Sequence, residues 1–328
     1  MIKIILYLNL NIYMNSNLFS ANYYTCTGNY KKLKDLISDD KSVNLDEALY
    51  IACGEYPNLE IAKLLVENGA DPNYINKYKS NALSKSSYLG KLEIVKMLLE
   101  HKITLDNINN ALITASISNK LDIVKLLLNH NASPNILDEN KRSPLMWAST
   151  HDNYEMVKLL FEKGGNINYI NPIFNSILTN SIINYNFNIF KFLLDNKVDI
   201  YQKDYMGQNS FYVACQYQRR DMIQLFIDYG YKEDDEFKVI LTATAKNWLE
   251  TLKVLLKNSF QINIINNKGI TPLMYACKNG NYEIVKLLLD NGANFTTKDI
   301  SGFNATRMAL IYENPEIYKL LKERGADE

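Results

Sequence analysis

The stretch that decides the fold is Gly269-Ile-Thr-Pro-Leu-Met-Tyr-Ala-Cys-Lys-Asn-Gly280-Asn-Tyr-Glu-Ile-Val-Lys-Leu-Leu-Leu-Asp-Asn-Gly-Ala-Asn294. Thr271 is a good N-cap, because its hydroxyl can accept a hydrogen bond from a free backbone N–H of the first turn. Pro272 follows at the first helical position, where the missing N–H costs nothing. The first half of the stretch therefore predicts a short helix over residues 271–278.

The second half predicts another helix over residues 282–290, after a break at Gly280. Gly292 then supplies the left-handed residue that ends many helices. The apolar residues of this second helix recur at a helical spacing and form one stripe, at Ile284, Leu287 and Leu288. The complete stretch is therefore expected to fold as a helical hairpin.

The motif Glu-Ile-Val-Lys-Leu-Leu-Leu and its variants recur along the whole chain. Their first residues are Lys31, Glu60, Glu93, Asp122, Glu155, Asn188, Asp221, Glu250, Glu283 and Glu316. The step between copies is 33 residues in six of the nine intervals and 29 residues in the other three. A fixed period of this size indicates a solenoid, in which hairpins stack on their neighbours and no single active-site cleft is built in.

This pattern resembles the ankyrin repeat, through Thr271-Pro-Leu-Met, Ser143-Pro-Leu-Met, Gly69-Ala-Asp-Pro-Asn73 and Gly325-Ala-Asp327. The resemblance covers about residues 15–328 and about ten repeats, counting weak copies at both ends. It implies an all-α repeat solenoid, a stack of helix-turn-helix units with β-turn fingers. It also implies that the fingers and first helices line a concave face that binds partners. We therefore expect one repeat domain over residues 15–328.

The chain departs from the family pattern in three ways. The histidine of the start motif is replaced throughout, by Met146, Met274, Ser84, Thr179, Tyr212 and Arg307, which puts local stability in doubt. The helix-ending glycine is replaced by Lys102, Asn131, Lys197 and Ser259, so strained or reshaped turns are expected there. Finally, the three 29-residue intervals predict short fingers with both flanking helices intact.

The first fourteen residues stand outside the repeats and carry an apolar run with one early lysine. Three interpretations remain open. The segment is an upstream extension with the true start at Met14, a poor export signal, or a hydrophobic element covering the first repeat. It is too short and too polar to span a membrane. Residues 17–26 already look like the first helix of repeat one.

The composition argues against catalysis, nucleic-acid binding and membrane anchoring. Lys plus Arg equals Asp plus Glu at 36 each, so the basic surplus typical of a nucleic-acid binder is missing. The sequence contains no Walker A run, no dinucleotide fingerprint and no H-E-x-x-H motif. Cys53, Cys215 and Cys277 share one repeat position and are expected to be buried small residues. We therefore predict no enzyme activity, no cofactor and no metal site.

The candidate site lies on the middle fingers. Exposed aromatic, Met and Arg side chains are enriched in interface cores, and loops on a rigid scaffold commonly carry recognition. The finger residues proposed to bind a partner are Arg142, Ile173, Phe174, Tyr205 and Met206, with Thr150, His151, Gln216 and Tyr217 from the first helices. The alternative is that Ile173 and Phe174 fold back onto their own weak repeat.

Two function classes follow. The favoured one is a non-catalytic scaffold or adaptor that binds another protein through its concave finger and first-helix surface. The alternative is a regulatory or inhibitory subunit that masks an enzyme, toxin or regulator, or an exported effector acting on a host protein. We expect a cytoplasmic monomer that binds no nucleic acid and no membrane, or an exported protein if residues 1–14 act as a signal.

Overall fold

The computed structural model describes residues 16–40, 43–54, 56–173, 175–203, 207–232 and 236–326. The fourteen-residue N-terminal segment and its alternative interpretations therefore lie outside the described residues. The chain divides into two compact units, Met1–Ile167 and Asn168–Glu328, each taken by itself below. The described residues form helices joined by turns and loops, with two isolated β-bridges at Ile170–Ser176 and Lys203–Asn209.

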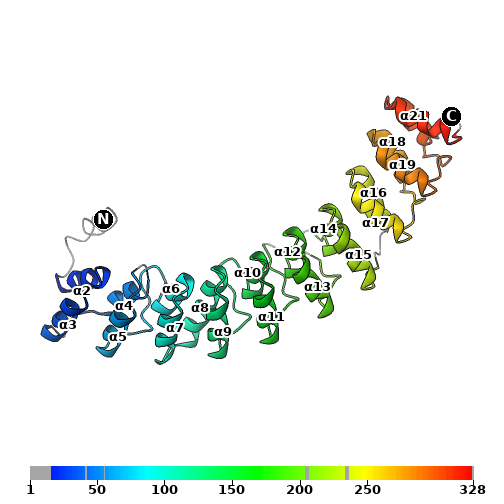
Figure 1. The fold of residues 1–328 in the computed structure, drawn as a ribbon. Coiled ribbons are helices and arrows are strands. Elements are labelled where there is room, and N and C mark those ends of the chain that lie inside the picture. The colour runs from blue at the N-terminus through cyan, green and yellow to red at the C-terminus, as the bar shows by residue number, and fades with distance from the viewer. Residues whose placement is uncertain are drawn as a thin grey trace. The chain divides into compact units, whose positions relative to one another are not determined.

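The N-terminal unit contains five helical hairpins, and in Figure 1 their first helices lie in one row and their second helices in another. The hairpins are α2 (Ser16–Cys26) with α3 (Tyr30–Asp39), α4 (Asp46–Ala52) with α5 (Leu59–Glu67), α6 (Ala82–Leu89) with α7 (Leu92–Leu99), α8 (Leu105–Ile117) with α9 (Leu121–Asn129), and α10 (Pro144–Thr150) with α11 (Tyr154–Glu162).

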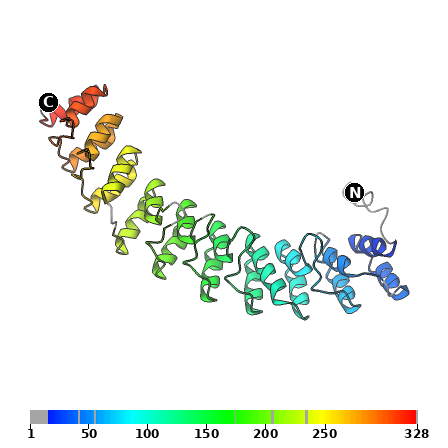
Figure 2. The same cartoon turned by 180° about the vertical axis from the view of Figure 1, so that it is seen from behind.

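The C-terminal unit has the same organisation, seen from the other side in Figure 2. Its hairpins are α12 (Ile177–Ile183) with α13 (Phe187–Asp195), α14 (Ser210–Gln216) with α15 (Arg220–Asp228), α16 (Glu236–Ala245) with α17 (Leu249–Lys257), α18 (Pro272–Asn279) with α19 (Tyr282–Asp290), and α20 (Ala305–Ile311) with α21 (Pro315–Glu323). Within each unit, first helices contact first helices and second helices contact second helices. The predicted all-α repeat solenoid is thus confirmed.

First helices begin at capping side chains in the same repeat position. The Thr271 Oγ1 accepts a hydrogen bond from the Met274 N–H at 3.1 Å, as the sequence predicts, and Pro272 occupies the first turn. Equivalent caps are made by Asn81, Ser143, Ser176, Asn209 and Asn304. Replacing such a cap by Ala costs about 1 kcal/mol, so these side chains stabilise helices as short as seven residues.

Several second helices, among them α5, α9, α13 and α19, bury two adjacent pairs of residues rather than the single stripe expected from spacing. In α19 the buried residues are Ile284, Val285, Leu288 and Leu289, whereas Leu287 is half-buried. The difference arises because each second helix packs against both its own first helix and the next second helix. The three cysteines Cys53, Cys215 and Cys277 are fully buried, as predicted.

Of the four turns that lack the helix-ending glycine, three keep the left-handed conformation and one is reshaped. Asn131, Lys197 and Ser259 take the left-handed conformation, with φ of 65°, 58° and 64°. Such a conformation costs a residue with a Cβ roughly 1–2 kcal/mol. Lys102 does not adopt it, because α7 ends one residue earlier and passes through Glu100 with φ −70°. The turn at Lys102 is therefore reshaped rather than strained, which is one of the two outcomes that the sequence predicts.

Candidate functional site

The fingers between hairpins are built by their leading Asp or Asn side chains. The Asn76 Oδ1 accepts hydrogen bonds from the N–H groups of Tyr78 (2.9 Å) and Ser80 (3.1 Å). Asp138, Asn171, Asn266 and Asp299 make the same kind of contact with residues two or four positions later. These are Asx turns, and they fix the tips through hydrogen bonds from backbone N–H groups to the leading side chain.

In the N-terminal unit, one finger and the helix after it form a stacked polar–aromatic cluster of Arg142, Trp147 and His151. The Arg142 guanidinium lies 4.7 Å from the Trp147 ring centre, and the His151 ring stacks on Trp147 at 6.3 Å. The Trp147 indole N–H donates to Asp138 Oδ2 at 2.9 Å. These contacts hold four side chains of different chemistry on the finger and first-helix side of the unit.

His151 is itself fixed by the preceding hairpin. Its Nε2 lies 2.8 Å from the Ile117 carbonyl oxygen, and because a carbonyl only accepts, this nitrogen carries the proton. The neighbouring Thr150 is exposed, and its hydroxyl donates to the Met146 carbonyl at 2.9 Å. The sequence had pointed to Arg142, Thr150 and His151 but missed Trp147, although Trp147 and His151 are one helical turn apart and must share a face.

In the C-terminal unit, the described candidates are Ile173, Gln216 and Tyr217, and all three are exposed. Ile173 is 57% exposed, which argues against the alternative that it folds back onto its own repeat. Tyr217 is 44% exposed, and the Arg219 guanidinium lies 5.8 Å from its ring centre. Phe174, Tyr205 and Met206 lie outside the described residues, so the part of the candidate site that they form stays a prediction.

The most exposed large apolar side chains of the described residues are on two outer fingers that the sequence did not single out. They are Tyr78, 75% exposed, and Ile300, 76% exposed. Each sits within two residues of the Asx side chain that shapes its turn. That offset from the leading Asn or Asp is a signal present in the sequence, and it marks the tip position of a finger.

The buried cysteines are unsuited to nucleophilic chemistry. Burial raises the pKa of the Cys53 and Cys277 thiols to about 12, so both remain protonated at neutral pH, and a thiol is a poor nucleophile. Within the described ranges, no three His, Cys, Asp or Glu side chains gather closely enough to hold a metal ion. Over the same part of the chain, no helix combines the length and apolar character needed to cross a membrane.

Stacked hairpins with Asx-turn fingers define a repeat protein of the ankyrin class, and comparison with known families agrees. The family profile described as ankyrin repeats, in three copies, matches residues 21–109, 102–171 and 239–328. These matches cover more than half of the sequence, and the chain belongs to the ankyrin repeat family.

Similar proteins come from distant sources. The ankyrin repeat protein L371 of Acanthamoeba polyphaga mimivirus is 26% identical over 170 residues, which is 49% of this chain and 22% of that protein. The human transient receptor potential cation channel subfamily A member 1 is 27% identical over 170 residues, 48% of this chain and 15% of the channel. The chain thus spans less than a quarter of the length of either relative. Among solved structures, the ankyrin repeat protein EF0377 is 24% identical, with a TM-score of 0.49 over 55% of this chain and 96% of that one.

Proposed function

We propose that this chain is a non-catalytic scaffold or adaptor that binds a partner protein through its fingers and first helices. Ankyrin repeats are in general protein–protein interaction modules. The observation that carries the proposal is the exposure of Tyr78, Ile173 and Ile300 on turns that are held by their own Asx side chains. Apolar tips on fixed turns have no folding role, and they lose little conformational entropy when a partner covers them.

Within the N-terminal unit, the Arg142–Trp147–His151 cluster is the proposed anchor. Trp and Arg are the residue types that most often dominate binding energy at interfaces, particularly where neighbours hold them in one conformation. The hydrogen bond from Trp147 to Asp138 and the contact of His151 with Ile117 supply that support. The second proposed contact is on the C-terminal unit and consists of Ile173, Phe174, Tyr205, Met206, Gln216 and Tyr217.

We further propose that residues 15–328 act as one repeat domain of about ten repeats and that the protein is a monomer in the cytoplasm. The ten described hairpins and the even balance of charge support this view. Residues 1–14 are proposed to be an extension or a weak signal-like segment that takes no part in binding.

Quantitative affinity capture tests the proposal. Wild-type protein is compared with Arg142→Ala/His151→Ala, with Tyr78→Ala/Ile300→Ala and with Lys125→Ala, an exposed control on a second helix. We expect at least one finger variant to lose a partner by about tenfold or more, because hot-spot truncations exceed 1–2 kcal/mol, while Lys125→Ala retains all partners.

A set of captured partners unchanged by both finger variants would contradict the proposal. Unchanged capture by Phe174→Ala/Tyr205→Ala would remove the contact proposed on the C-terminal unit. An activity assay on each captured partner then separates a scaffold, which leaves that activity unaltered, from an inhibitory subunit, which suppresses it.

A further inference from the structure

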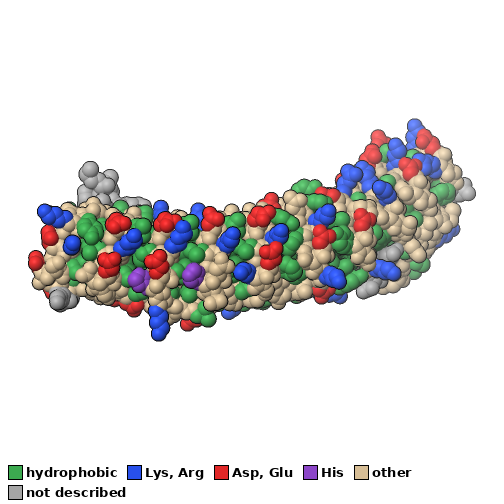
Figure 3. Space-filling view, turned by 60° about the horizontal axis from the view of Figure 1, so that its bottom comes forward, with side chains coloured by type: hydrophobic (Ala, Val, Ile, Leu, Met, Phe, Trp, Pro, Cys, Tyr) green, Lys and Arg blue, Asp and Glu red, His purple; other side chains and the backbone are tan. Residues whose placement is uncertain are grey.

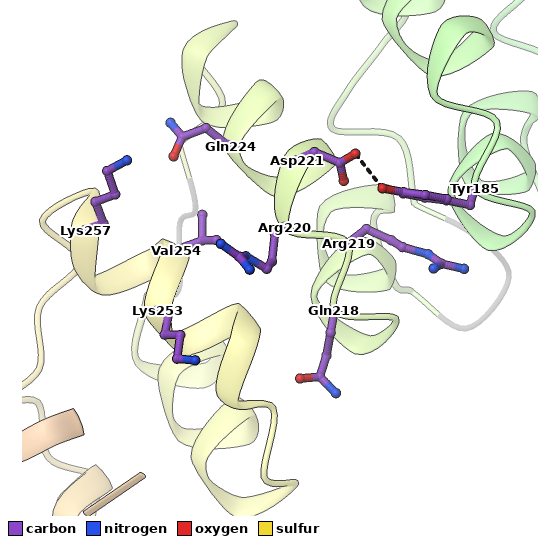
Figure 4. A pocket seen from close by; sticks show the side chains of 9 residues that line it. All are labelled: Tyr185, Gln218, Arg219, Arg220, Asp221, Gln224, Lys253, Val254 and Lys257. Atoms are coloured by element: carbon purple, nitrogen blue, oxygen red, sulfur yellow. Dashed lines mark hydrogen bonds between the residues drawn. The ribbon is translucent and has the colours of Figure 1, made fainter. Parts of the chain in front are cut away.

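The C-terminal unit carries a basic groove on its second-helix side, away from the fingers. The groove has a volume of about 660 Å³ and lies between α15 and α17, beside the turn that precedes α13. Figure 4 shows the side chains of Arg219, Arg220, Lys253 and Lys257 around it, with Asp221 facing Tyr185. Four cationic side chains and one carboxylate, that of Asp221, therefore line the groove.

Two of these cations stand where no other repeat of the chain has a cation. Arg220 occupies a position that is otherwise apolar, namely Tyr30, Leu59, Leu92, Leu121, Tyr154, Phe187, Leu249, Tyr282 and Pro315. Lys257 occupies a position that is otherwise acidic or neutral, namely Ser38, Glu67, Glu100, Asn129, Glu162, Asp195, Asp228, Asp290 and Glu323. Because the hairpin folds without a cation at either position, folding does not account for them.

A third cation, Arg219, stands where two other repeats have Lys (Lys91 and Lys120), one has Trp248, and six have Asn, namely Asn29, Asn58, Asn153, Asn186, Asn281 and Asn314. At this position Asn58 and Asn153 cap their helices, whereas Arg219 makes no side-chain cap. Its guanidinium instead lies 4.6 Å from the Tyr185 ring centre and donates to the Ile183 carbonyl at 3.3 Å. Its buried Nε has no hydrogen-bond partner among the described residues.

The cations of the groove outnumber the carboxylates that contact them. Glu250 bridges two of them, with 3.1 Å to Arg220 Nη1 and 2.7 Å to Lys253 Nζ. The hydrogen bond from Lys253, together with the charges of Lys253 and Arg220, lowers the pKa of Glu250. The Asp221 carboxylate accepts the Tyr185 hydroxyl at 2.8 Å. The exposed Lys257 ammonium has no ion pair or hydrogen bond with the described residues.

We propose that this groove binds a short acidic segment of a partner protein, with Asp or Glu side chains seated on Lys257, Arg220 and Lys253. In the free protein, the Glu250 carboxylate occupies the position on Arg220 and Lys253 that a partner carboxylate takes when it binds. Gln218 also lines the groove, and its amide NH₂ can donate to the backbone of such a segment, whereas its oxygen accepts from the Glu250 N–H and the Gln224 amide is bonded to Asp228 and Asn258. The site lies on the opposite side from the fingers and does not rest on the function proposed for them.

A nucleic acid fits this groove less well, because the basic charge does not continue along neighbouring helices. The positions equivalent to Lys257 on α15 and α19 are Asp228 and Asp290, which would repel a phosphate backbone running past the groove. Figure 3 shows acidic and basic side chains interspersed over the second-helix side. The basic charge is thus local and matches two or three carboxylates rather than a polyanion.

Fluorescence anisotropy of the full chain with three labelled probes tests the proposal. The probes are a peptide of alternating Glu and Ser, its Gln–Ser counterpart, and a single-stranded oligonucleotide of the same charge as the first peptide. We expect the Glu peptide to bind, the Gln peptide to bind at least about tenfold more weakly, and binding to weaken as salt is added.

Two variants with opposite expected effects make the test specific. Lys257→Glu introduces the residue found at this position in four other repeats, and it should weaken binding about fivefold or more. Glu250→Gln releases Arg220 and Lys253 and should tighten binding about two- to fivefold. Lys158→Glu, an exposed lysine of α11 with the same change in net charge, is the control and should leave binding unchanged.

Circular dichroism of each variant confirms that the helices are retained. Absence of Glu-peptide binding, equal binding of the Glu and Gln peptides, or equal effects of Lys257→Glu and Lys158→Glu would each overturn the proposal. Tighter binding of the oligonucleotide than of the Glu peptide would also overturn it, in favour of a nucleic-acid ligand.

Discussion

Two junctions of the N-terminal unit make the same kind of connection with different structures. Each joins a second helix to the next first helix, but α7 and α8 are separated by five residues, and α9 and α10 by fourteen. The longer junction carries a finger and is followed by a seven-residue helix, whereas the shorter one leads directly into a helix of thirteen residues. The four residues missing from that interval therefore do not merely trim a finger. They let the first helix start earlier.

The two junctions also satisfy their polar groups differently. In the first turn of α8, the buried Asn107 accepts from the Asn81 amide at 3.0 Å and donates to Asn73 Oδ1 at 3.2 Å. Before α10, the half-exposed Asp138 accepts from the Arg142 N–H and from the Trp147 indole. A junction without a finger thus places its polar contacts in the interior, and a junction with a finger displays them. Only the second kind carries the exposed polar and aromatic side chains on which the proposed function depends.

Truncating a core residue of α9 should give the largest effect, because α9 packs beside both junctions. Leu127 is fully buried, so Leu127→Ala should lower the free energy of unfolding by about 2–5 kcal/mol. Its neighbour Leu126 is half-buried, and Leu126→Ala should cost clearly less. Urea titration followed by circular dichroism measures both. Equal losses would mean that burial does not separate these two positions.

Removing the interior amide should give the next largest effect. Asn107→Ala leaves the Asn81 amide N–H without its acceptor in a buried site, at an expected cost of about 1–3 kcal/mol, whereas the Asn73 side chain keeps its hydrogen bonds with the Lys102 carbonyl and the Thr104 N–H. The same urea titration measures the loss. If Asn107→Ala proved neutral, water must reach this junction, and the contrast with the finger would disappear.

Removing the corresponding finger side chain should cost less, because water can replace part of its hydrogen bonding. Asp138→Ala is expected to lower stability by about 0.5–1.5 kcal/mol. It should also alter the fluorescence of Trp147, whose indole N–H loses its acceptor. The other tryptophan, Trp248, lies in the C-terminal unit and should not respond. A stability loss equal to that of Asn107→Ala would refute the distinction between the junctions.

The sequence predicted the hairpins well because their signals are local and repeated. A cap, an apolar stripe and a break recur in each copy, and the copies reinforce one another. The first helix at residues 17–26, the Thr271 cap and the buried cysteines were all confirmed. The stripe in α19 was assigned to Leu287 instead of Leu289, because spacing alone does not reveal that the helix packs on two sides.

Features that depend on neighbouring repeats escaped prediction. The sequence indicated a short finger before α8, but whether a shortened loop becomes a turn or more helix depends on the partners of Asn107 in the previous repeat. The role of Trp147 could not be predicted from the sequence, because it depends on its contacts with Asp138, Arg142 and His151. The basic groove likewise joins residues from two hairpins and the turn beside them.

The smallest expected effect on stability comes from backbone strain, which differs between a lysine of the finger and a lysine of the junction without a finger. Lys141 in the finger has φ 59°, at the position where three other fingers have Gly207, Gly269 and Gly302 with φ of 73°, 73° and 77°. Lys141→Gly relieves the left-handed strain but adds entropy to the unfolded chain, so a net gain of about 0.5 kcal/mol is expected.

Lys102, in the junction without a finger, is not left-handed. Lys102→Gly therefore relieves nothing and should lower stability by roughly 0.5 kcal/mol through the unfolded chain alone. Thermal unfolding of wild type and of the two variants tests whether their changes in stability have opposite signs. The signs are easier to establish than either magnitude. A shift of both variants in the same direction would show that the finger stores no strain at Lys141, and that its lysine is as well accommodated there as a glycine.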